Sequence, residues 1–169
     1  MKQLKTLLFA AILFIGATSF VNAQSKVAHI NVQELIESMP AYKEAQKQLD
    51  QMAETYDAQI KELATALKTK MDQYKAEANT QTDEENQNRM KELSGLEQNI
   101  RQYQANAQQD MQKKNIELLK PITEDAKAAI LKVARAQGFD YVLDSTQGGD
   151  VIMADGKDLT TDVRKELGF

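Results

Sequence analysis

The two prolines of this chain, Pro40 and Pro121, enclose a stretch that holds a single glycine, Gly95, and neither valine nor phenylalanine. This stretch is rich in Gln, Glu, Lys and Ala, which favour a helix. Proline, which breaks a helix, and glycine, which weakens one, are almost absent from it. It is too poor in β-branched and aromatic residues to form a sheet, whereas valine and phenylalanine are found outside it. The sequence therefore predicts a predominantly α fold with a small β part (α+β).

The N-terminal residues 1–23 have the three-part pattern of a secretory signal peptide. Lys2 and Lys5 precede an apolar run from Leu7 to Ala17, and the segment ends on the small residue Ala23. The run is much shorter than the roughly 20 residues that span a bilayer. We therefore expect the segment to be removed, leaving a soluble exported protein that starts at residue 24.

Composition excludes several classes of partner. The formal net charge is −4, and it becomes −6 when Lys2 and Lys5 are removed. An acidic chain with interspersed Lys and Glu is a poor binder of nucleic acid and of anionic membranes. The chain has no cysteine and its mature part has only two phenylalanines, Phe139 and Phe169. Stability must then come from packing or from oligomerisation, and the sparse core favours oligomerisation.

Residues 41–120 are expected to form a coiled-coil arm. In the first half of this segment, from Leu49 to Ala78, apolar residues recur with a period of 11, so that Leu49, Ile60 and Met71 are equivalent, a period typical of a nearly straight seam. A turn is predicted at the tip, near 79–83, followed by a capping box in which Thr82 caps the second helix and Glu85 reaches back. Two helices joined by such a turn form an antiparallel hairpin.

The second helix is expected to run through Pro121 and to end near Gln137, with Gly138 as its C-terminal stop. A proline inside a helix removes one backbone hydrogen bond and kinks or loosens the helix. Pro121 is therefore a hinge candidate at the root of the arm.

The remaining residues, 24–40 and 121–169, are expected to form a strand-bearing body. Strands are predicted near 26–32, 140–144 and 150–154, with a short helix started by Asn31 and a final helix capped by Thr160 or Thr161. A three-stranded unit of this size is expected to complete its core with another copy. The candidate residues for this oligomerisation are Val27, Ile30, Val32, Tyr141, Leu143, Val151 and Met153.

No arrangement of residues indicates an enzyme, a cofactor or a metal site. His29 is the only histidine and there is no cysteine, so the usual metal ligands are missing. We expect His29 to be a structural residue on a strand face. Gly148–Gly149 lies between strands rather than before a helix, and Asp83–Glu84–Glu85 lacks the spacing of a calcium loop.

Methionines in the arm allow two interpretations. They fill the seam between the helices, or their flexible thioether side chains bind many different apolar segments. The candidates for client binding are Met52, Met71, Tyr74, Met90, Leu93, Leu96 and Met111.

Three blocks of sequence resemble the Skp (OmpH-like) family of periplasmic chaperones. They are Lys26 to Val32, which runs into a short helix, Phe139 to Asp144, and Asp158 to Val163, with the long hairpin between the first two. The resemblance implies a homotrimer whose arms enclose a cavity and hold unfolded outer-membrane β-barrel proteins without ATP. Familiar members of that family tend to be basic, whereas this chain is acidic, with a pI of about 5.1.

An alternative function belongs to a different class. An exported coiled-coil scaffold or spacer of the cell envelope has the same long helices. It would dock one preferred partner on a fixed face of the arm and would respond little to unrelated unfolded proteins.

Overall fold

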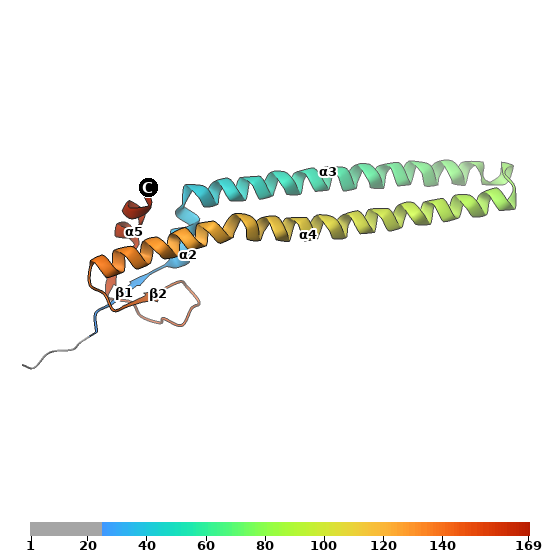
Figure 1. The fold of residues 1–169 in the computed structure, drawn as a ribbon. Coiled ribbons are helices and arrows are strands. Elements are labelled where there is room, and N and C mark those ends of the chain that lie inside the picture. Colours follow the sequence, from blue (N-terminus) through green and yellow to red (C-terminus); the bar gives the residue numbers. More distant parts are fainter. Residues whose placement is uncertain (1–24) are drawn as a thin grey trace, which may run out of the picture.

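The computed structural model describes residues 25–169, so the predicted signal peptide lies outside the described part of the chain. The predicted fold class is confirmed: long helices accompany one small sheet (Figure 1). In chain order the elements are β1 (Val27–Ile30), α2 (Val32–Ser38), α3 (Pro40–Glu77), the 3-10 turn η2 (Ala78–Thr80), α4 (Asp83–Ala136), β2 (Tyr141–Asp144), β3 (Lys157–Asp158) and α5 (Thr160–Leu167). Within residues 25–169, no helix is apolar over a length sufficient to cross a membrane.

Helices α3 and α4 lie side by side as an antiparallel hairpin that projects from the strands, α2 and α5 (Figure 1). Pro40 is the first residue of α3, a position where its missing N–H has no helical acceptor to lose. The two helices have 38 and 54 residues, or about 57 Å and 81 Å at the standard helical rise. The excess length of α4 returns into the body and supplies much of the core.

Capping at the tip follows the prediction in part. The Thr82 hydroxyl accepts a hydrogen bond from the backbone N–H of Glu85 at 3.2 Å, which confirms Thr82 as the cap of α4. The Glu85 carboxylate does not reach back to Thr82 but accepts from Arg89 Nε at 3.4 Å, one turn further on. The Glu85 carboxylate therefore pairs with the charged Arg89 on the same helix face instead of with the backbone N–H of Thr82.

Helix α4 runs without interruption through Pro121. It ends at Ala136, where Gly138 adopts φ 70° and its N–H donates to the Arg135 carbonyl oxygen at 3.1 Å. The N–H of Phe139 donates to the carbonyl oxygen of Ala134 at 3.0 Å. These bonds satisfy the last carbonyls of the helix and confirm Gly138 as its stop.

The sheet is parallel, with strand order β2-β1-β3. Ala28 and Ile30 of β1 are buried, whereas Val27 is exposed, so one face of the sheet carries the core. Leu35 of α2, and Leu159 and Val163 at α5, are fully buried in the same cluster. From α4 the cluster receives Ile122, Ala126, Ala129, Ile130, Val133 and Ala134.

The strand predicted near 150–154 is wrong: the third strand is Lys157–Asp158. The backbone N–H of Leu159 donates to the His29 carbonyl oxygen at 3.0 Å, and the Leu159 side chain is fully buried. Burial of Leu159 therefore draws the two residues before it onto the edge of β1. The apolar residues predicted as a strand remain in a loop, and Ile152 is fully exposed.

Two further predictions about the body need correction. Val32 is the first residue of α2 rather than part of the first strand, because the Asn31 side chain accepts from the Glu34 N–H at 3.0 Å and starts the helix there. The threonine cap predicted for the last helix is also wrong. The Asp158 carboxylate accepts from the Thr160 N–H at 2.7 Å and from the Thr160 hydroxyl at 2.6 Å.

Candidate functional site: the two-helix arm

Packing between α3 and α4 becomes looser from the body toward the tip. Between residues 41 and 120, the buried side chains are Ala45, Leu49 and Ala107, all in the half of the arm nearer the body. Further out, seam residues such as Leu67 and Ile100 are only half-buried. The outer arm thus keeps apolar surface in contact with water, which a tightly closed coiled coil removes.

Midway along the arm, polar contacts of two tyrosines join the helices. The Tyr56 hydroxyl donates to Asp110 Oδ2 at 2.9 Å, and the Tyr103 hydroxyl donates to the Gln59 side-chain oxygen. The two rings meet edge to face with their centroids 5.8 Å apart. We call these four residues the tyrosine brace. Its hydrogen bond to Asp110 raises the pKa of Tyr56, which keeps the phenol protonated.

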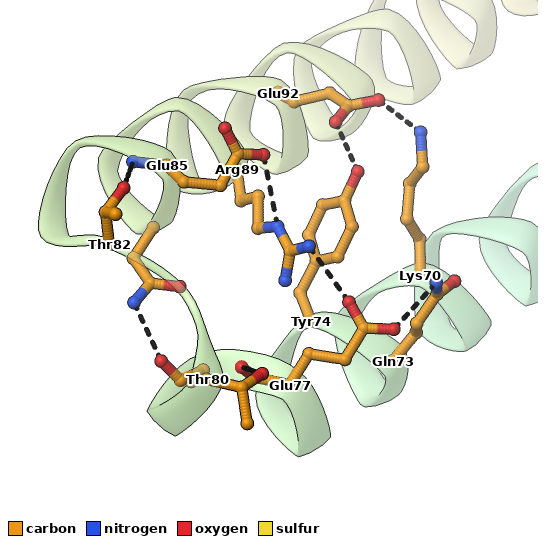
Figure 2. A network of polar contacts seen from close by, with 11 residues as sticks. Lys70, Gln73, Tyr74, Glu77, Thr80, Thr82, Glu85, Arg89 and Glu92 are labelled. Atoms are coloured by element: carbon orange, nitrogen blue, oxygen red, sulfur yellow. Dashed lines mark hydrogen bonds and ion pairs between the residues drawn. The ribbon is translucent and has the colours of Figure 1, made fainter.

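A second set of contacts joins the helices near the tip (Figure 2). The Tyr74 hydroxyl donates to Glu92 Oε2 at 2.5 Å, and Lys70 forms an ion pair with the same carboxylate. The Arg89 guanidinium lies 4.6 Å from the centre of the Tyr74 ring and donates to Glu77 Oε2 at 2.9 Å. We call Lys70, Tyr74, Glu77, Arg89 and Glu92 the tip clasp.

Electrostatics favour the closed clasp near neutral pH. The hydrogen bonds from Lys70 and Tyr74 lower the pKa of Glu92, and those from Gln73 and Arg89 lower the pKa of Glu77. The Glu92 carboxylate in turn raises the pKa of Tyr74. Both carboxyl groups are therefore ionised and the phenol is neutral over a wide pH range.

Between the brace and the clasp lies a groove of about 950 Å³, the mid-arm groove. Its apolar lining comes from Leu63, Leu67, Leu96 and Ile100. Lys61, Glu62, Thr65, Thr69 and Asn99 contribute polar side chains. Leu63 remains 41% exposed. Because polar contacts hold the helices together at both ends, the apolar seam between them is left accessible.

The structure distributes the predicted client-binding residues along the arm rather than in one site. Leu96 lines the mid-arm groove, and Met52 lines a smaller hollow beside the tyrosine brace. Met71 and Met90 are 45% and 70% exposed, whereas Leu93 and Met111 are half-buried. Tyr74 belongs to the tip clasp, so its hydroxyl is already bonded.

Sequence reasoning missed several members of this surface. Leu63, Leu67 and Ile100 line the groove, and Ile116 is 65% exposed nearer the body. The 11-residue period places Leu63 and Leu67 in the seam, which was the available signal. The period does not predict how closely α3 and α4 pack along the seam, because that packing depends on the polar contacts at either end.

The predicted oligomerisation residues divide into three groups. Val27, Tyr141 and Leu143 are exposed, and the strand register places them on the sheet face opposite the core. Ile30 is buried in the chain's own core and offers no surface to a partner, and Val32 is packed against that core. Val151 and Met153 lie in the loop before β3, with Met153 75% exposed.

His29 has a structural role. Its Nδ1 lies 3.2 Å from the Ser145 hydroxyl and its Nε2 lies 3.2 Å from the Gly156 carbonyl oxygen, so one ring holds both ends of the loop between β2 and β3. Among residues 25–169, no group of three or more His, Cys, Asp or Glu side chains is arranged to hold a metal ion.

The chain is similar in sequence to known proteins. The family model "Outer membrane protein (OmpH-like)" matches residues 26–167. A relative named chaperone protein Skp, from Photorhabdus laumondii, is 27% identical over 166 residues, which cover 97% of this chain and 99% of the relative. Another of that name, from Pectobacterium atrosepticum, is 23% identical over 155 residues, or 92% and 93% of the two chains.

The fold is also similar to a crystal structure of an OmpH-like protein from Caulobacter crescentus. The two agree with a TM-score of 0.75 over 86% of this chain and 85% of the other, at 16% sequence identity. At that identity the likeness shows a common fold.

Proposed function

Because the chain belongs to the OmpH-like outer membrane protein family, we propose that it is a periplasmic chaperone of outer-membrane proteins that works as an ATP-independent holdase. In this proposal three chains associate through their bodies, and unfolded β-barrel proteins are enclosed between the three arms. The observation that carries it is the outer arm: an apolar seam that is half open between the tyrosine brace and the tip clasp. The names of the relatives point to the same class of function.

The arm surface suits weak and repeated contact. Burial of apolar surface contributes about 25 cal/mol per Å², so one groove with a few half-exposed leucines binds only weakly. Several arms acting on one client raise the effective concentration of each further contact. Since each contact is weak, the client can leave without nucleotide hydrolysis.

Exposed methionines extend this surface beyond the groove. Met71 and Met90 project from opposite helices of the arm near the tip clasp, and their unbranched side chains adapt to different apolar partners. Such a surface discriminates little between client sequences, as holding many unfolded chains requires.

The test measures light scattering while a denatured outer-membrane β-barrel protein is diluted into buffer without ATP. The purified protein is expected to suppress aggregation at three chains per client. The double variant Met71→Gln, Met90→Gln should need a higher concentration for equal suppression, whereas Gln104→Asn, an exposed change on the arm, should behave as the wild type. Absence of suppression at any ratio overturns the proposal, and stable binding of one folded envelope partner would indicate a scaffold instead.

A further inference from the structure

Every sulfur atom of this chain belongs to a methionine, because the sequence contains no cysteine. The methionines differ widely in their exposure to solvent. Met39 lies in the body core and is 5% exposed, whereas Met71 and Met90 in the outer arm are 45% and 70% exposed. Since oxidants attack an exposed thioether more readily than a buried one, these two side chains carry the most reactive sulfur atoms of the arm.

The two exposed methionines lie in the same short stretch of the outer arm. The bond from Arg89 to Glu77 fixes the register of α3 and α4, so that Met90 lies beside the residue that precedes Glu77. Met71 is about 7.5 Å from that point along the axis of α3. The half-buried Leu93 follows Met90 by one turn on the same face of α4. Both thioethers therefore belong to the apolar surface at the tip clasp.

Neither methionine is needed to hold the two helices together at this point. The tip clasp consists of hydrogen bonds and ion pairs between oxygen and nitrogen atoms, and none of these contacts involves a sulfur atom (Figure 2). The buried side chains of the arm lie nearer the body. A chemical change at Met71 and Met90 is therefore expected to alter the surface of the arm and to leave its fold intact.

A peroxide converts a thioether to a sulfoxide by the transfer of one oxygen atom. The sulfur lone pair attacks one oxygen of hydrogen peroxide, an S–O bond forms as the O–O bond breaks, and the second oxygen leaves as water after a proton shift. The sulfur loses two electrons and the peroxide gains them. The product is polar, so its burial against an apolar segment has a free-energy cost that burial of the thioether does not have.

We propose that Met71 and Met90 form an oxidation site through which peroxides regulate the arm: conversion of both side chains to sulfoxides weakens the contact of the arm with apolar client segments. In the proposed periplasmic location, no cytosolic pool of thiols removes such oxidants. Because a sulfoxide can be reduced to the thioether again, the change is reversible. This inference rests on the proposed function and names a way in which that function is controlled.

The first test identifies the oxidised residues. The protein is treated with increasing doses of hydrogen peroxide, digested, and analysed by peptide mass spectrometry. Met71 and Met90 are expected to gain one oxygen atom each at the lowest doses, the half-buried Met52 and Met111 at higher doses, and Met39 last. Circular dichroism at the dose that oxidises the first two should show unchanged helix content. Oxidation of Met39 as early as Met71 and Met90, or a loss of helix at that dose, overturns the proposal.

The second test measures aggregation suppression after the peroxide has been removed. The oxidised wild type should need a several-fold higher concentration than the untreated wild type for equal suppression. Methionine sulfoxide reductases of both stereospecificities, with a dithiol that supplies the two electrons, should restore the original value. The variant Met71→Leu, Met90→Leu has no sulfur at either position, so peroxide should not weaken it relative to its own untreated sample. Met153→Leu, a matched change in the body, should lose suppression on oxidation as the wild type does.

The outcomes separate the two proposals. Equal suppression before and after oxidation, no recovery on reduction, or the same loss in the variant Met71→Leu, Met90→Leu each overturns the regulatory site while the chaperone activity of the untreated protein stands. Absence of suppression by the untreated protein instead overturns the proposed function and this regulation with it, and the order of oxidation found by mass spectrometry is unaffected.

Discussion

Glu92 is the residue on which the tip clasp depends, because its carboxylate joins α4 to both Lys70 and Tyr74 of α3. The hydrogen bond from Lys70 is the largest of the influences that lower the Glu92 pKa, and the charge of Lys70 lowers it further. In Lys70→Met the pKa of Glu92 should therefore rise toward its ordinary value, measured by NMR titration of the side-chain carboxyl carbon. Lys68→Met, two positions away, should not move it; an unchanged Glu92 pKa in Lys70→Met would refute the ion pair.

The same pKa directions define the pH range of the clasp. Glu92 and Glu77 have lowered pKa values, so their contribution is complete above the ordinary value of 4.5 and is lost as the pH falls through the folded-state values. Tyr74 has a raised pKa, so its contribution is complete below the ordinary value of 10.0 and is lost as the pH rises through the folded-state value. The contacts of the tip clasp, observed by NMR, should be complete between pH 4.5 and pH 10.0. They should weaken as the pH passes the folded-state pKa values on either side.

Several single residues were predictable because their role is local. Asn31 and Thr82 cap helices, and Gly138 ends one, through bonds to residues within a few positions. Tyr74 was predicted as a client contact, whereas its hydroxyl binds Glu92 on the other helix. That partner lies 18 positions away, and the pairing follows from the hairpin register rather than from local sequence.

At the scale of elements, Pro121 interrupts the hydrogen bonding of α4 without ending it. The carbonyl of Glu117 has no N–H to accept from at position 121, so we expect the helix to be softer where arm and body meet. Pro121→Ala should restore that bond and reduce backbone mobility at the root of the arm, measured by NMR relaxation. Lys120→Ala serves as the control, and equal mobility in Pro121→Ala and the wild type would rule out a hinge.

Substitution of leucines in the arm seam should lower the free energy of unfolding more near the body than near the tip. Leu49 is 6% exposed, whereas Leu63 is 41% exposed. Leu49→Ala should lower the free energy of unfolding by about 2–5 kcal/mol, and Leu63→Ala by less than about 1 kcal/mol. Urea denaturation compares the two, and equal losses would show that the outer seam is as closed as the inner one.

The sequence predicted both arm helices and the strands β1 and β2, but it placed the third strand in the wrong segment. The apolar seam of each arm helix repeats over many turns and predicts the helix, and the capping box at Thr82 predicts where the second helix starts after the turn. The loop segment near 150–154 is largely apolar and contains two β-branched residues, as a strand does, but the available edge of β1 is taken by Lys157 and Asp158, which have little strand character of their own. The buried Leu159 next to them decides the pairing, and that requires the three-dimensional core.

At the scale of the whole molecule, the body should resist local unfolding more strongly than the arm. Nearly all buried side chains belong to the body and the adjoining root of the arm. Amide hydrogen exchange is therefore expected to be slowest around Ile30, Leu35 and Val133, and faster by orders of magnitude between residues 60 and 100. Uniform protection along α4 would contradict this division.

In the part of the chain that the structure describes, strand β1 near the N-terminus pairs only with strands near the C-terminus. The backbone N–H of Lys26 donates to Asp140, 114 positions later, and β1 is flanked on both sides by strands that follow the arm. Because synthesis proceeds from the N-terminus, both helices of the arm are complete before β1 has a partner. A nascent or truncated chain that stops before Tyr141 has an arm but no sheet. Only a finished chain therefore has the complete body on which the proposed association of copies depends.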